Sequence, residues 1–137
     1  MSENLKILGE YSNAMIEGDT AAVFDFWAPE FESHVTARVS PDQVGRDVRA
    51  HEQEWWQQVA SAFPDYEFTV GLLIEHDDLI VSNWTVRGTH TGTAFYDVAP
   101  SGGPVEINGT AILRMRDGKI VEHWGGPHCQ KGLGLIQ

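Results

Sequence analysis

Four stretches in the second half of the sequence have the spacing of β-strands, and they constrain the fold more than any other feature. Residues 66–74 largely alternate between apolar and other side chains, and residues 79–91 are rich in β-branched and aromatic residues. Residues 105–116 and 119–124 are separated only by the Asp-Gly dipeptide at 117–118, which is a strong hairpin signal. The pattern predicts successive antiparallel strands that bury one face.

The first half of the sequence has helical spacing instead. Apolar residues recur at helical intervals over residues 3–16, and a second short helix is expected over residues 20–26, ended by Pro29. Residues 31–39 are predicted as a first strand and residues 46–62 as a third helix. This order predicts a cone-shaped α+β domain, in which three N-terminal helices pack on one side of a curved antiparallel sheet.

Length, charge and cysteine content limit the partners and the cellular compartment that can be expected for this protein. The 137 residues fit one domain, 1–137, because a chain of this size buries a single core. Twenty acidic and nine basic residues give a formal charge of −11, so neither nucleic acid nor a membrane is expected as a partner. The N-terminus lacks a signal-peptide pattern, and Cys129, the one cysteine, cannot form an internal disulfide. We therefore expect a cytoplasmic protein.

Four short motifs connect this architecture to a known family. They are FPD at 63–65, RGTHTG at 87–92, APSG at 99–102 and DGKIVEHW at 117–124. With the order of the elements, they resemble the SnoaL-like polyketide cyclases of the nuclear transport factor 2 (NTF2) and ketosteroid isomerase superfamily. The resemblance implies an NTF2-like cone, a homodimer and a hydrophobic, carbonyl-rich substrate. Because the superfamily hosts several enzyme classes and proteins that only bind, the pocket residues must select the function.

One position departs from the family pattern. In the polyketide cyclases of this family, a catalytic aspartate directly follows the residue that corresponds to Trp124, and a histidine lies on the preceding strand. Here those positions are Gly125 and, by the register of the 117–118 hairpin, Ala111. Because glycine cannot abstract a proton, another residue must act as the base, or the chemistry differs.

Three histidines are candidates for the acid/base role. His128 follows two glycines and a proline, which permit an abrupt backbone path toward the missing aspartate, although an exposed loop histidine is the alternative. His34 lies on the first predicted strand, which crosses the pocket entrance in related proteins; a structural histidine is the alternative. His123 shares a face with Gly125 if the strand is regular, so it is expected to point inward and Glu122 outward.

Arg87 is a candidate for stabilising negative charge, and its direction is the open question. Arg87 and His90 differ by three positions, so they lie on opposite faces of a regular strand. An inward Arg87 would polarise a carbonyl group or bind a carboxylate. An outward Arg87 would pair with an acid on the neighbouring strand, and the cost of burying an unpaired arginine favours this placement.

The expected pocket walls are mostly aromatic. They would suit an aromatic or polycyclic ligand, whereas ordinary core packing is the alternative. A helix–sheet cone would also aim His51 at the cavity, although a solvated helix face is favoured for that residue. The substrate-binding candidates are Trp55, Phe63, Tyr66, Trp84, Phe95, His51 and Trp124.

The sequence contains no phosphate-binding loop, nucleotide fingerprint or metal-ligand motif such as His-Glu-x-x-His, which predicts chemistry without a cofactor or metal. The leading hypothesis is a cofactor-independent cyclase or isomerase that transfers protons through His128 or His34. Two alternatives stay open. An epoxide-opening enzyme would need two carboxylates from Asp65, Asp97 and Glu122, and a non-catalytic binding protein would keep the cone alone.

Overall fold

The computed structural model describes residues 2–34 and 48–133. Helix α1 (Glu3–Ile16) begins at Ser2, whose hydroxyl oxygen accepts a hydrogen bond from the backbone N–H of Leu5 at 3.1 Å. One side of α1 is buried through Leu8, Tyr11, Ala14 and Met15. The predicted helix over residues 3–16 is therefore confirmed, with the apolar spacing that predicted it forming the buried side.

The next elements are α2 (Thr20–Asp25), β1 (Trp27–Ser33) and α3 (Val48–Ala62). Strand β1 begins four residues earlier than predicted and includes Pro29, which was expected only to end a helix. A proline is tolerated there because β1 lies at an edge of the sheet. On the side of β1 that has no neighbouring strand, no backbone hydrogen bond is lost when the N–H is missing. Positions 35–39 and 46–47 of the predicted elements lie outside the described residues.

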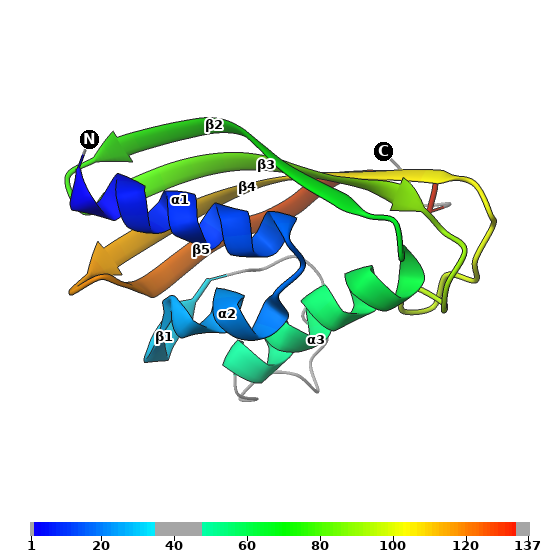
Figure 1. Ribbon diagram of the computed structural model, residues 1–137, viewed down its shortest axis with the longest axis horizontal. Helices are drawn as coiled ribbons and strands as arrows, with labels where there is room; N and C mark the ends of the chain where they lie inside the picture. Colours follow the sequence, from blue (N-terminus) through cyan, green and yellow to red (C-terminus); the bar gives the residue numbers. More distant parts are fainter. Residues whose placement is uncertain (1, 35–47, 134–137) are drawn as a thin grey trace.

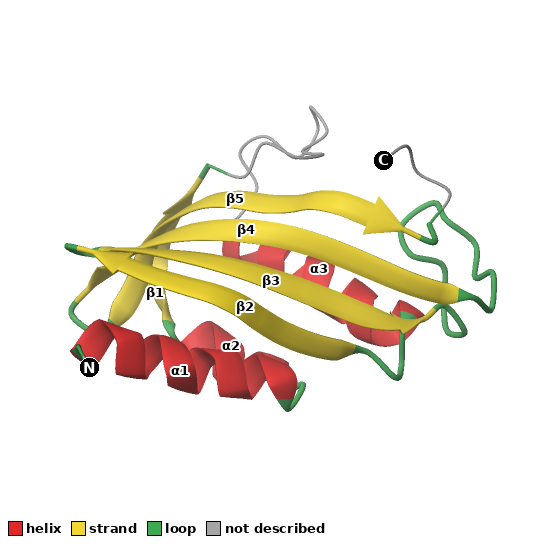
Figure 2. Ribbon diagram, turned by 90° about the horizontal axis from the view of Figure 1, so that it is seen from above, coloured by secondary structure: helices red, strands yellow, loops and turns green. Residues whose placement is uncertain are grey.

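Strands β2 (Glu67–His76), β3 (Leu79–Thr89), β4 (Pro104–Arg116) and β5 (Lys119–Lys131) complete the sheet. The strand order is β1-β5-β4-β3-β2. The last four strands are antiparallel as predicted, and β1 joins the edge parallel to β5. The predicted α+β class is confirmed, because all three helices lie on the same side of a curved sheet (Figures 1 and 2).

Strand β5 is longer than the predicted strand over residues 119–124. Its backbone stays paired with β4 as far as Lys131, which lies opposite Glu106. Gly125 and Gly126 adopt φ angles of 102° and 137°, values that residues with a side chain rarely adopt. These two glycines and a register shift near Gly109 let the strand continue, so His128 belongs to a strand and not to the predicted loop.

The two faces of the sheet differ in burial. We call the face that the helices cover the inner face and the opposite face the outer face (Figure 1). Along β3, Ile80, Ser82, Trp84 and Val86 are buried on the inner face, whereas the residues between them are partly exposed. Strand β4 repeats the alternation. Among the described helices, none is long and apolar enough to cross a membrane.

Candidate active site

Aromatic side chains form one cluster between α3 and the inner face. The ring of Trp84 on β3 lies 5.9 Å from Trp55, 6.4 Å from Trp56 and 6.1 Å from Phe68, between ring centroids. Phe95, in the loop between β3 and β4, extends the cluster through Trp55. Most of these rings are buried, and together they give one end of the inner face an apolar, aromatic surface.

Beside Trp84, a row of short side chains crosses three strands of the inner face. Ser82 on β3 lies opposite Ala111 on β4, and Ala111 lies opposite Gly125 on β5. The pairing of Ala111 with Gly125 arises through a register shift between Arg114 and Met115. In the next row the ring of Trp84 covers Gly109, so the bulky indole lies directly beside these short side chains.

His123 borders the row of short side chains. It is two positions before Gly125 on the same face of β5, and it is only 8% exposed, which confirms its predicted inward direction. Its ring packs edge-on against Trp27, with 5.4 Å between centroids. Burial, and to a lesser extent the charge of His34, lower the pKa of His123 to about 4. The imidazole is therefore neutral at pH 7.

The outer face carries a separate polar network around Glu122. One carboxylate oxygen of Glu122 is 2.8 Å from His34 Nε2, and the other accepts a hydrogen bond from Arg114 Nε at 2.9 Å. These two hydrogen bonds hold the pKa of Glu122 below its usual range. Arg114 also donates from its NH1 nitrogen to both carboxylate oxygens of Asp78 at 2.9 Å. The ring of His34 stacks on Trp124 at a centroid distance of 5.0 Å.

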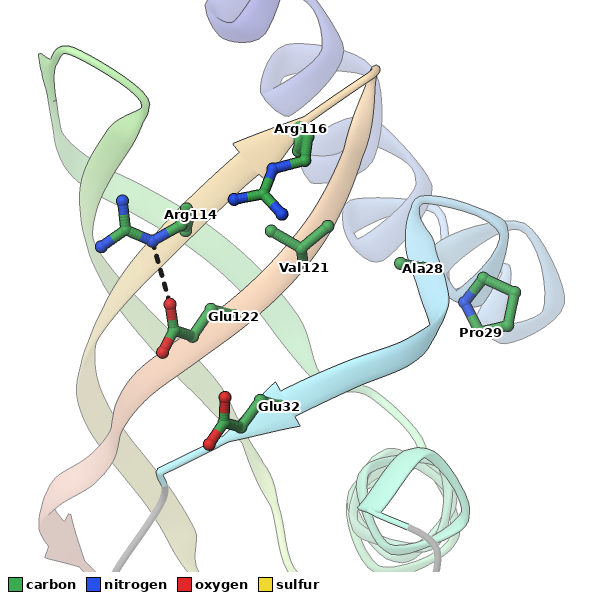
Figure 3. A pocket seen from close by; sticks show the side chains of 7 residues that line it. All are labelled: Ala28, Pro29, Glu32, Arg114, Arg116, Val121 and Glu122. Atoms are coloured by element: carbon green, nitrogen blue, oxygen red, sulfur yellow. Dashed lines mark hydrogen bonds and ion pairs between the residues drawn. The ribbon is translucent and has the colours of Figure 1, made fainter.

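An open groove of about 630 Å³ lies beside this network. Figure 3 shows that its walls come from β1, β4 and β5, with charged side chains along one side and short apolar ones on the other. It is lined by Ala28, Pro29, Glu32, Arg114, Arg116, Val121 and Glu122. The groove is therefore on the outer side of the sheet, away from the aromatic cluster.

Comparisons with known proteins agree with the fold. The family model for SnoaL-like polyketide cyclase matches residues 6–128. The chain belongs to this family. No curated protein matches the sequence. AclR of Streptomyces galilaeus, provisionally named a hydroxylase, superposes with a TM-score of 0.78 and 26% identity, covering 93% of this chain and 76% of AclR. IdmH of Streptomyces antibioticus, provisionally named a polyketide cyclase, superposes with a TM-score of 0.70 at 28% sequence identity. The match covers 92% of each chain.

A third structure extends the likeness at the level of the fold. A protein from Acidithiobacillus ferrooxidans, provisionally named a polyketide cyclase, superposes with a TM-score of 0.72 at 23% identity. The match covers 97% of this chain and 91% of that protein. The fold of this chain is thus shared with a protein that is only 23% identical to it.

Within this SnoaL-like fold, four of the seven predicted wall residues come together. Trp55, Trp84 and Phe95 belong to the aromatic cluster, and Phe63 joins it through Phe95 at 5.1 Å. Tyr66 lies half-buried at the start of β2, where burial raises the pKa of its hydroxyl group. These residues lie on the helix side of the sheet, and Phe63, Trp84 and Phe95 belong to the buried hydrophobic core, which is the alternative given for them.

Other predicted residues lie elsewhere. The side chain of Arg87 is 59% exposed and donates to Glu106 on β4 at 2.9 Å, so the inward placement is wrong and the outward alternative is confirmed. Trp124 follows the inward His123 on β5, and His34 follows Ser33, the residue that pairs with His123. Both side chains therefore point to the outer face, where their rings stack on each other. The side chains of His51 and His128 lie outside the described residues.

Sequence reasoning missed the residues that organise the outer face. Asp78 and Arg114 are 36 positions apart, and no local pattern links the turn before β3 to the end of β4. The sequence analysis also assigned no role to His90. That residue is fully buried, and its Nε2 nitrogen is 2.8 Å from the carbonyl oxygen of Thr93. The only signal for His90 was its place on the face opposite Arg87.

Proposed function

We propose that this SnoaL-like protein is a cofactor-independent cyclase or isomerase that acts on a hydrophobic, carbonyl-rich small molecule of secondary metabolism. The observation that carries the proposal is the position of His123. This buried imidazole lies on the same face as Gly125, the position of the family's catalytic aspartate, two residues away along β5. Family membership supports the reaction class.

In this proposal the substrate lies along the row formed by Ser82, Ala111 and Gly125. Trp84 bounds the row on one side and packs against an apolar, aromatic part of the ligand. His123 bounds the other side and removes a proton from the carbon next to a carbonyl group. The hydroxyl group of Ser82 donates a hydrogen bond to the oxygen on which negative charge develops. The proton then returns from His123 to the product.

The other predicted bases have different relations to this site. His34 lies on the outer face, but its backbone N–H donates to the carbonyl oxygen of His123 at 2.7 Å. It therefore holds the strand that carries His123 and does not face the substrate. His128 remains a second candidate base in the proposal, and His128→Gln is assayed in the same exchange experiment as His123→Gln.

The test is deuterium incorporation at carbon. The purified protein is incubated in D₂O with a panel of aromatic polyketide esters and ketones, and exchange next to the carbonyl group is followed by NMR. We expect His123→Gln to slow exchange by at least about 100-fold, the usual contribution of a general base. His76→Gln is the control, because the side chain of His76, at the end of β2, is 85% exposed. Exchange at the wild-type rate in His123→Gln would assign the base elsewhere.

One observation favours a second function. Gly125 supplies no acid/base group where the family has an aspartate, which suits a protein that binds a small molecule and releases it unchanged. Saturable binding of a panel member, detected by tryptophan fluorescence without deuterium exchange, would support this function. The epoxide-opening alternative has lost its support, since Asp65 and Asp97 are exposed and Glu122 is bound to Arg114 on the outer face.

We also propose a homodimer formed through the outer face. Leu72 and Ile74 on β2 are 51% and 50% exposed, and both point to the side that no helix covers. Large apolar side chains exposed side by side on a sheet commonly mark a contact surface. A second copy of the chain would bury them, as the family resemblance implies.

A further inference from the structure

Three metal-binding side chains meet on the outer face, at the parallel pairing of β1 with β5. Glu32 lies opposite Glu122 in the register of the two strands, and His34 follows at the end of β1. Their ligand atoms all lie within 4.8 Å of one another. We propose that Glu32, His34 and Glu122 bind a divalent transition-metal ion of the zinc class.

The distances fit a metal ion after small side-chain movements. His34 Nε2 is 2.8 Å from Glu122 Oε2 and 3.8 Å from Glu32 Oε1. Zinc bonds of about 2.0–2.2 Å in a tetrahedral site separate neighbouring ligand atoms by about 3.4 Å. One distance must therefore lengthen and the other shorten by about half an ångström. The ion would bind the lone pair of His34 Nε2, and the neutral ring would then carry its proton on Nδ1.

Two of the three ligands are held in position before an ion arrives. The imidazole of His34 stacks on Trp124 with an angle of 16° between the rings, which fixes the ring plane. Glu122 is oriented by Arg114, which is itself held by Asp78. Such support around the ligands raises metal affinity, because less freedom is lost on binding. Glu32, 70% exposed, is the one ligand that must be ordered.

Access and charge also suit a cation. Glu32 and Glu122 line the open groove, so an ion can enter from solvent and keep water in its remaining coordination positions (Figure 3). Two carboxylates and a neutral imidazole match the charge of a divalent ion, and the charge of Arg114 beside Glu122 is offset by its second carboxylate partner, Asp78. A mixed set of one nitrogen and two oxygen ligands favours zinc over magnesium or calcium, which prefer oxygen alone.

The experiment is a titration of the chelator-treated full chain with ZnCl₂ by isothermal calorimetry. We expect one ion per chain and a dissociation constant at least about tenfold weaker in His34→Gln and in Glu32→Gln. Because Glu32 is largely exposed, Glu32→Gln tests the ligand without risk to folding. The matched control is His76→Gln, since His76 Nε2 lies 3.4 Å from one carboxylate oxygen of Asp77 and both side chains are exposed.

The outcomes separate clearly. Wild-type affinity in His76→Gln, with weakened binding in the two ligand variants, supports the site. Failure of the wild-type chain to bind zinc overturns it, as does undiminished binding in either ligand variant. The readout is independent of turnover and of His123, so failure of the proposed enzymatic function would leave this result unaffected.

Discussion

Replacing Gly109 by alanine should force Trp84 out of its place in the aromatic cluster. A Cβ atom at position 109 would lie 2.1, 2.4 and 2.7 Å from three atoms of the six-membered ring of the Trp84 indole. The ring cannot simply move aside, because Trp55, Trp56 and Phe68 pack around it. Overpacking of this kind costs about 1–3 kcal/mol, and we expect Gly109→Ala to lower the free energy of unfolding by that amount.

A double-mutant cycle isolates the cause of this loss. Trp84→Leu removes the three atoms that the new Cβ would meet, so Gly109→Ala should cost almost nothing in that background. The coupling energy should then be about 1–3 kcal/mol, measured by urea unfolding at a fixed protein concentration. Gly71→Ala is the control, because its Cβ would lie 3.4 Å from Asn83 Oδ1, an ordinary contact. An equal cost of Gly109→Ala in both backgrounds would refute the reasoning.

Three further predictions concern stability and assembly. Hydrogen bonds from the backbone N–H and the hydroxyl group of Thr89 lower the pKa of Asp65 below its usual value of 3.8. Asp65→Asn should therefore reduce the free energy of unfolding at pH 7. The difference in stability between variant and wild type should vanish as acid protonates the wild-type carboxylate. Urea unfolding at a series of pH values checks this. Gly9→Ala should stabilise the chain by about 0.5–1 kcal/mol in thermal unfolding, because a Cβ on helix α1 meets nothing within 4 Å. Ile74→Glu should convert a dimer to a monomer in sedimentation experiments, and an unchanged mass would exclude this part of the outer face from the interface.

Local patterns in the sequence were enough for most elements of the fold. The alternation over residues 79–91 identified β3, and the Asp-Gly dipeptide at 117–118 identified the hairpin of β4 and β5, whereas a register shift between Arg114 and Met115 places Ala111 opposite Gly125. These predictions succeeded because side-chain direction alternates along a strand whatever it pairs with. The same rule separated Arg87 from His90 and put His123 on one face with Gly125, the face that the family resemblance marks as inward.

The ends and edges of the sheet were harder to predict. Strand β1 starts at Trp27 because its backbone finds a partner near Ile120 of β5, and β5 continues to Lys131 because β4 is long enough to pair with it. Both extensions depend on hydrogen bonds between segments far apart in the chain. The residues next to each segment in the sequence do not identify such distant pairing partners.

The sequence by itself determined the class of fold and the order of its elements, since each follows from periodicity along a few residues. The expected inward direction of His123 rested in addition on the family resemblance, which marks the side of Gly125. Only the tertiary structure decided which side chains meet. It brought His34 to Glu122, 88 positions away, and assembled the aromatic cluster from α3, β2, β3 and the loop after β3. Contacts of this kind depend on how strands pair and how helices cover the sheet, and those arrangements are set by the packing of the whole chain.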